Sequence, residues 1–130
     1  PAAVERLQPW LEGVGSAVPM EEGMFDAATA ISGSGPGLYA YVVEQFEAAA
    51  RALGFAPEQA SRLAVDTFAG TGRYLAETGE TPAALRERVT SPGGTTAAGL
   101  AALEGRGRAA AVLGAAEAAR DRGRELREGA

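Results

Sequence analysis

The sequence contains no cysteine, no histidine and no lysine, so all of its basic residues are arginine. Without cysteine and histidine, the chain offers no thiolate or imidazole ligand for zinc, no thiol nucleophile and no imidazole base. Zinc sites and serine–histidine catalytic triads are therefore excluded, and we expect no metal site. The absence of lysine also excludes a P-loop, whose lysine contacts the bound phosphates.

Long apolar runs and clusters of one charge are missing as well. No apolar stretch approaches the roughly 20 residues that a helix needs to cross a bilayer, and no start typical of a secretory signal is present. The net charge is -5, and the arginines are scattered or, between Arg120 and Arg127, mixed with acidic residues. We therefore expect a soluble, cytoplasmic protein that binds neither membranes nor nucleic acids.

The residues that are present favour an all-α domain. The chain has 130 residues, of which 46% are hydrophobic, enough for one domain with a core. Apolar residues recur every three or four positions, which predicts helices over about 4–14, 22–31, 36–53, 57–75, 82–89 and 95–104, and a last helix ending near 127. Thr81 is placed to cap the helix that Pro82 opens. Gly70 and Gly72 lie inside a helix, so we expect something to cross close to them.

The short stretch "SAVPM" does not fit this helical pattern. It could form a strand over residues 16–20, which Pro19 would confine to the edge of a sheet. No second strand is found to pair with it. A strand without a partner indicates that its sheet lies elsewhere.

Several patterns resemble functional motifs but carry little information. "GPGLYA" and "GRGRAA" both satisfy a loose dinucleotide-binding pattern, yet neither follows a convincing strand, which that fingerprint requires. The acidic pairs Glu21–Glu22 and Glu44–Glu47 fit exposed helix positions better than acid–base sites. These motifs therefore predict no catalytic machinery.

Two glycine-containing turns are better candidates. "SGSGPG" can be a helix junction in which Ser34 caps the helix opened by Pro36, or a small-residue surface that a flat ligand can approach. "TSPGGTT" can be an ordinary capped turn. It can also form an anion cup, because its glycines expose backbone N–H groups at the positive end of a helix that starts near Thr95, and its hydroxyls can donate to a carboxylate.

Three stretches together resemble one known family: "DAATAISGSGPGLYAYV", "PAALRERVTSPGGTTAAGLAALE" and "AAEAARDRGREL". The chain resembles the C-terminal half of pyrroline-5-carboxylate reductase, the last enzyme of proline biosynthesis, and the middle stretch is the most specific. Two positions depart from the usual family pattern: Gly37 stands where alanine is common, and Arg108 where a large apolar residue is usual.

The resemblance implies a particular architecture and partner. Residues 21–130 would form an all-α dimerisation and substrate-binding domain, a helical bundle like the C-terminal domain of 6-phosphogluconate dehydrogenase. Residues 1–20 would be a helix–strand remnant of a Rossmann-type domain that binds NADP or NAD. The partner would be a second copy of the chain, in a homodimer or a higher oligomer of such dimers. Because the nucleotide domain is missing, we expect the chain to be inactive alone.

The resemblance also implies roles for individual residues. The substrate carboxylate would lie on Ser91 and the backbone around Gly94, Thr95 and Thr96, with the Thr96 hydroxyl facing the imine nitrogen as the catalytic group. The cofactor's nicotinamide would lie near residues 34–36, that is Ser34, Gly35 and Pro36. The alternative is a free-standing all-α dimerisation module without catalytic activity.

Overall fold

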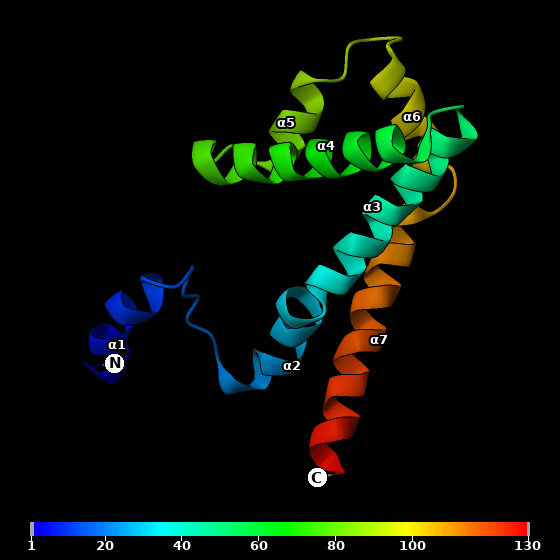
Figure 1. The fold of residues 1–130 in the computed structure, drawn as a ribbon. Coiled ribbons are helices and arrows are strands. Elements are labelled where there is room, and N and C mark those ends of the chain that lie inside the picture. Colours follow the sequence, from blue (N-terminus) through cyan, green and yellow to red (C-terminus); the bar gives the residue numbers. More distant parts are fainter. Residues whose placement is uncertain (1, 130) are drawn as a thin grey trace.

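The computed structural model describes residues 2–129, which fold into helices joined by short connections (Figure 1). No strand is present among these residues. The α-helices are α1 (Ala2–Glu12), α2 (Phe25–Ala28), α3 (Gly35–Ala52), α4 (Pro57–Thr78), α5 (Pro82–Arg88), α6 (Thr95–Glu104) and α7 (Arg108–Glu128). A 3₁₀ turn, η1 (Glu22–Met24), precedes α2, and a π-helical turn, η2 (Thr29–Gly33), joins α2 to α3. The expected all-α class is confirmed.

Helices α3 and α4 form a helical hairpin connected by residues 53–56. The rings of Tyr39 on α3 and Phe68 on α4 pack with their centroids 5.9 Å apart. Pro57 occupies the first turn of α4, where its missing N–H removes no intrahelical hydrogen bond. The Gln59 side chain accepts the N–H of Ala56 at 3.2 Å. The predicted start of α4 is therefore confirmed.

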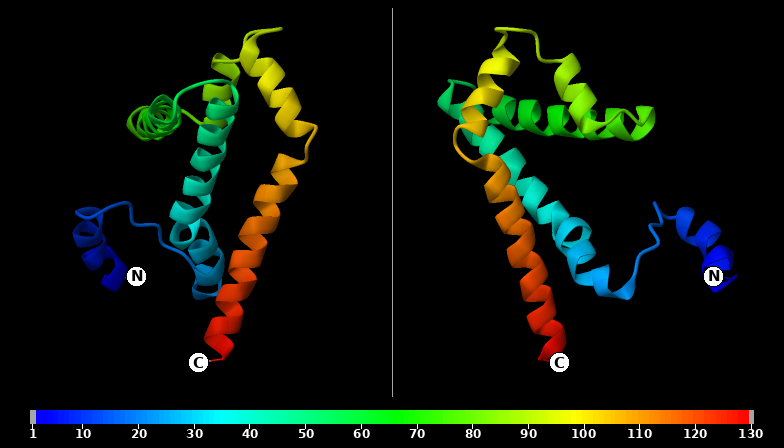
Figure 2. Two further views of the ribbon diagram at one scale, coloured as in Figure 1. Left: turned by 45° about the vertical axis from the view of Figure 1, so that its right-hand side comes forward. Right: turned by 180° about the vertical axis from the view of Figure 1, so that it is seen from behind.

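Helix α7 runs back along α2 and η2, so the last helix lies beside one of the first (Figures 1 and 2). An ion pair joins them. The carboxylate of Asp26, only 13% exposed, lies 3.0 Å from a guanidinium nitrogen of Arg127 and 3.8 Å from Nε of Arg124. Asp26 also lies beside half-buried Gly123, where an added Cβ would make an ordinary contact at 3.7 Å from Oδ1 of Asp26. These contacts fix the C-terminal part of α7 against α2.

The described residues bury little apolar surface. Ala30 and Ala60 are the buried hydrophobic residues, whereas large side chains such as Phe46, Leu53 and Val112 stay exposed by 58%, 81% and 69%. The chain exposes 10181 Å². A compact monomer of 13.2 kDa would expose about 6,400 Å². The described residues therefore lack the buried core of a self-sufficient monomer.

The N-terminal segment differs in part from the expectation. The predicted first helix is present as α1, and it lies apart from the other helices in every view (Figures 1 and 2). Residues 16–21, however, form neither helix nor strand. A strand is defined by hydrogen bonds to a neighbouring strand, and the described residues supply none. The division of the chain at residue 20 stays a prediction.

One further local expectation, the cap at Ser34, was wrong. Ser34 does not cap α3, because its backbone is itself helical and its side chain makes no capping hydrogen bond. The helical path runs through η2 into α3, and the N–H of Ser34 donates to the carbonyl of Thr29 at 2.8 Å. Among residues 2–129, no atom lies within 4 Å of a Cβ added at Gly70 or Gly72, so the close crossing expected there stays a prediction. No helix among residues 2–129 is both long and apolar enough to cross a membrane.

Candidate functional site

The stretch from Ser91 to Gly94 forms a tight turn between α5 and α6. The carbonyl of Ser91 accepts the N–H of Gly94 at 3.0 Å, and Gly93 has a φ of +69°. Pro92 at the second position and a left-handed residue at the third are the signature of a type II turn, which requires glycine or asparagine at that third position. The predicted glycine-dependent turn is therefore present.

Gly94 also provides space for the Ser91 side chain. A Cβ at Gly94 would collide with Oγ of Ser91 and would lie 3.1 Å from the Ser91 carbonyl oxygen. The N–H of Gly94 is already used inside the turn. The contribution of Gly94 to a site is thus the absence of a side chain, which keeps the Ser91 hydroxyl close to the backbone where α6 begins.

The N-terminus of α6 supplies unpaired backbone donors. Gly94 is extended, with φ −77° and ψ 173°, and no side chain caps the helix. The first intrahelical bond runs from the N–H of Ala98 to the carbonyl of Gly94 at 3.1 Å, so the N–H groups of Thr95, Thr96 and Ala97 precede it. These donors and the helix dipole favour an anion here. Thr95 is exposed, whereas Thr96 is half-buried. The predicted residues Ser91, Gly94, Thr95 and Thr96 thus lie in the turn and the first residues of α6, and their joint role as an anion cup stays a prediction.

A polar cluster at the ends of α4 and α5 was not predicted from the sequence. Arg88, the last residue of α5, forms an ion pair with Glu80 at 2.9 Å, and its guanidinium lies 5.2 Å from the centroid of the Tyr74 ring. Arg88, and after it Tyr74, hold the pKa of the Glu80 carboxyl below its usual value. Arg88 and Glu80 are eight positions apart, so helical spacing alone gave no signal for the pair.

The segment predicted to face the cofactor lies elsewhere. Ser34, Gly35 and Pro36 stand where η2 passes into α3, at the opposite end of α3 from the region of the α5–α6 turn (Figure 1). With 18 residues, α3 is about 27 Å long. Gly35 is buried and Ser34 is half-buried. The structure therefore brings Ser91 to Thr96 together, but it does not bring residues 34–36 to them within one chain.

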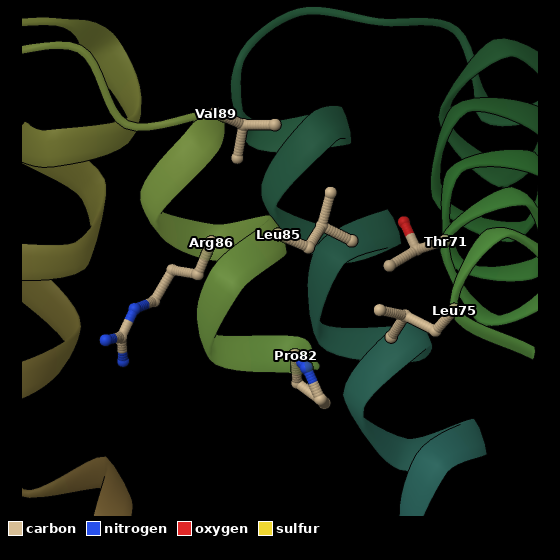
Figure 3. Close-up of a pocket in the computed structure, with 6 residues that line it drawn as sticks. All are labelled: Thr71, Leu75, Pro82, Leu85, Arg86 and Val89. Carbon is tan, nitrogen blue, oxygen red and sulfur yellow. The ribbon is translucent and has the colours of Figure 1, made fainter. Parts of the chain in front are cut away.

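A shallow groove of about 290 Å³ lies between α4 and α5 (Figure 3). Figure 3 shows Thr71 and Leu75 of α4 directed toward Leu85 of α5, while the Arg86 side chain extends away from them. The lining is mainly apolar and contains none of the predicted site residues. The groove is thus a packing surface of α5, not the predicted anion cup.

The sequence matches a known family over most of its length. The family described as pyrroline-5-carboxylate reductase dimerisation matches residues 22–126. The chain is 38% identical over 126 residues to a pyrroline-5-carboxylate reductase of Synechocystis, covering 97% of this chain and 47% of that protein. It is 44% identical over 115 residues to the enzyme of Thermus thermophilus, covering 88% and 43%. The chain thus spans less than half the length of these relatives.

The fold has the same relatives. The crystal structure of a Plasmodium falciparum pyrroline carboxylate reductase with NADP bound matches with a TM-score of 0.78 and 31% identity, over 82% of this chain and 43% of that one. The family match begins at η1, ends within α7 and includes residues 91–96. On this evidence, the chain belongs to the pyrroline-5-carboxylate reductase dimerisation family.

Proposed function

We propose that this chain is the dimerisation and substrate-binding part of a pyrroline-5-carboxylate reductase, which reduces 1-pyrroline-5-carboxylate to L-proline with NADPH or NADH. The observation that carries the proposal is the cup from Ser91 to Thr96. It combines a hydroxyl held at a turn, free backbone N–H groups and a helix N-terminus. A small anion with a reacting nitrogen close to its carboxylate fits this set of donors.

The carboxylate of the substrate would bind to the Ser91 hydroxyl and to the N–H groups at the start of α6. This carboxylate keeps its charge throughout hydride transfer, so its contacts stabilise the bound substrate and the transition state equally. Gly94 supports these contacts because its missing side chain leaves the Ser91 hydroxyl in place. The cup would thus bind and orient the substrate.

The hydroxyl of half-buried Thr96 would face the imine nitrogen. The reduced nicotinamide, when bound, supplies the hydride for the C=N carbon. As the C=N bond is reduced, the nitrogen becomes more basic, so a hydrogen bond from Thr96 strengthens along the reaction and lowers the barrier. This chemistry needs neither histidine nor a metal ion from the chain.

Residues Ser34, Gly35 and Pro36 would contact the nicotinamide end of NADP or NAD. Ser34 makes no capping hydrogen bond, so its hydroxyl is free to pair with a polar group, and buried Gly35 presents no side chain. These residues fit an edge contact with the cofactor, whereas the phosphates require a glycine fingerprint that lies outside this chain.

We further propose that the active enzyme is a homodimer, or a cytoplasmic assembly of such dimers. The separation of residues 34–36 from the Ser91–Thr96 cup supports a site completed between two chains. The large exposed apolar surface supports the same conclusion. Gly70 and Gly72, where an added Cβ would meet no described atom within 4 Å, would allow a partner helix to approach closely.

The test is an activity comparison between the full-length enzyme, containing its nucleotide domain, and residues 1–130 alone. We expect oxidation of NADPH or NADH that depends on 1-pyrroline-5-carboxylate in the full-length enzyme and no turnover by the shorter chain. A dimeric full-length protein without this activity would support the alternative of a non-catalytic dimerisation module.

A further inference from the structure

The polar cluster at the ends of α4 and α5 is built more firmly than an ordinary surface ion pair. Arg88 donates from Nε to Oε1 of Glu80 at 3.2 Å and from Nη2 to Oε2 at 2.9 Å, which is a bidentate pair. The guanidinium also lies over the Tyr74 ring of α4. One arginine thus contacts both the segment that precedes α5 and the helix below it.

Glu80 is itself held in place at the end of α4. Gly79 adopts a left-handed φ of +67°, which ends the helix, and its N–H donates to the carbonyl of Leu75 at 3.0 Å. The N–H of Glu80 then donates to the Thr78 hydroxyl at 3.2 Å, and that hydroxyl donates to the carbonyl of Tyr74 at 2.8 Å. The acceptor for Arg88 is therefore fixed relative to α4.

Thr90, the residue before the tight turn, is hydrogen-bonded to the last turn of α5, which also contains Arg88. The hydroxyl of Thr90 donates to the carbonyl of Arg86 at 2.5 Å, and its N–H donates to the carbonyl of Glu87 at 3.1 Å. Ser91, the first residue of the tight turn, follows directly. A shift of the C-terminal end of α5 would therefore move Ser91 as well.

The remaining contacts of α5 with α4 are apolar and open. They line the shallow groove of Figure 3, where Leu85 faces Thr71 and Leu75. Among residues 2–129, the Arg88–Glu80 pair is the only ion pair that links α5 to the end of α4. The bidentate geometry of this pair adds a directional contact to the non-directional apolar ones.

We propose that Arg88 is a positioning residue for the substrate carboxylate: through its pair with Glu80 and its place over Tyr74, it holds the end of α5 and so the Ser91 hydroxyl. This inference rests on the proposed function of the cup. Arg88 would act without touching the reacting atoms. Its effect is on the affinity of the site for the substrate carboxylate.

The test uses the full-length enzyme with Arg88→Gln, Glu80→Gln and both changes together. Because the pair is partly solvent-exposed, each single variant should raise the KM for 1-pyrroline-5-carboxylate by about twofold to fivefold and leave kcat unchanged. The KM of the double variant should not exceed that of the single variant with the higher KM, because both changes break the same interaction. Arg88→Lys keeps the charge without the bidentate fork and should recover part of the loss.

Arg86→Gln is the matched control, because Arg86 lies on the same short helix, points away from α4 in Figure 3 and forms no ion pair in the described structure. Its KM should equal that of the wild type. If Arg88 instead attracted the substrate directly, Glu80→Gln would lower the KM while Arg88→Gln raised it. That opposite response would overturn the proposal.

Hydrogen exchange at the amides of Thr90 and Gly94 provides a readout independent of catalysis. Both amides are hydrogen-bonded, and both should exchange about twofold to fivefold faster in Arg88→Gln and Glu80→Gln than in Arg86→Gln. A wild-type protein without reductase activity would refute the proposed function, and the exchange data would then decide whether the pair holds the turn. If both amides exchanged at the wild-type rate in Arg88→Gln and Glu80→Gln, Arg88 would not be a positioning residue.

Discussion

Two regions of this chain are stabilised in opposite ways. The segment from Thr81 to Ala98 is closed by its own hydrogen bonds: a threonine cap whose hydroxyl accepts the N–H of Ala84 at 3.2 Å, a tight turn, and a first helical bond at Ala98. The framework of α3, α4 and α7 instead leaves most of its large apolar side chains exposed. The conformation of the Ser91–Thr96 stretch is thus specified by local hydrogen bonds, whereas the large apolar side chains of the framework find little cover among the described residues.

The largest expected effect concerns the framework. If its exposed surface is completed by a second chain, an obligate interface should bury about 2,000 to 5,000 Å² in total, and dissociation should be coupled to unfolding. We expect a dimeric mass by light scattering at micromolar concentration and a melting temperature that rises with protein concentration. A fully helical monomer with a concentration-independent melting temperature would show that the framework is stable without a second chain.

The next largest effect should come from the cup, in the full-length enzyme. Thr96→Val keeps the β-branched shape and removes the hydroxyl. Losing one hydrogen bond to a developing charge should cost roughly 1.5 to 3 kcal/mol, or about tenfold to a hundredfold in kcat. The measurement is steady-state kinetics with a hydride isotope effect that shows chemistry to be rate-limiting. An unchanged kcat in a folded dimer would show that Thr96 has no catalytic role and serves only at the start of α6.

Ser91→Ala is the counterpart within the same cup. Its hydroxyl is assigned to a carboxylate whose charge is constant, so the KM should rise by about tenfold while kcat stays nearly the same. The contrast between a kcat effect at Thr96 and a KM effect at Ser91 separates the two roles. Equal effects of both variants on kcat would contradict the assignment.

A smaller effect is expected from overpacking the framework. Ala60 is fully buried on α4, so Ala60→Leu should lower the free energy of unfolding by about 1 to 3 kcal/mol. The matched change Ala83→Leu, at an exposed position of α5, should alter it by less than about 0.5 kcal/mol. Chemical denaturation of both variants at one protein concentration makes the comparison. Equal losses would mean that α5 is as tightly packed as the α3–α4 hairpin.

The smallest effect is the pH response of the Arg88–Glu80 pair. The pKa of Glu80 is lowered in the folded state, chiefly by its hydrogen bonds with Arg88. The stabilising contribution is therefore complete above the ordinary pKa of a glutamate and is lost as the pH falls through the lowered folded value. An NMR titration should show the carboxyl of Glu80 shifting toward its ordinary pKa in Arg88→Gln. An unchanged titration would show that Arg88 does not set this pKa.

Much of this architecture could be predicted because its signals are local. The helix starts at Pro57 and Pro82, the cap at Thr81 and the turn at Gly93 each depend on residues within one or two turns of chain, and all are confirmed. The expected strand near Pro19 was not formed, since a strand needs a partner that local sequence cannot supply.

Other features escaped prediction because they depend on three-dimensional arrangement. The cap expected at Ser34 failed because η2 carries the helix through that residue, and nothing in "SGSGPG" distinguishes a π turn from a break. The Arg88–Glu80 pair depends on the left-handed Gly79 that reverses the chain between them. The roles of Ser91, Thr96 and residues 34–36 stay predictions.

The π turn η2 has a consequence for how the helices face one another. A π turn accommodates one more residue than an α turn of the same span, and each residue of an α-helix advances the direction of its side chain by about 100°. Deleting one residue from Thr29–Gly33 would therefore rotate everything on its N-terminal side by about that angle relative to α3. Asp26 would then point away from Arg124 and Arg127. The π turn thus sets the rotation of α2 about the helix axis relative to α3.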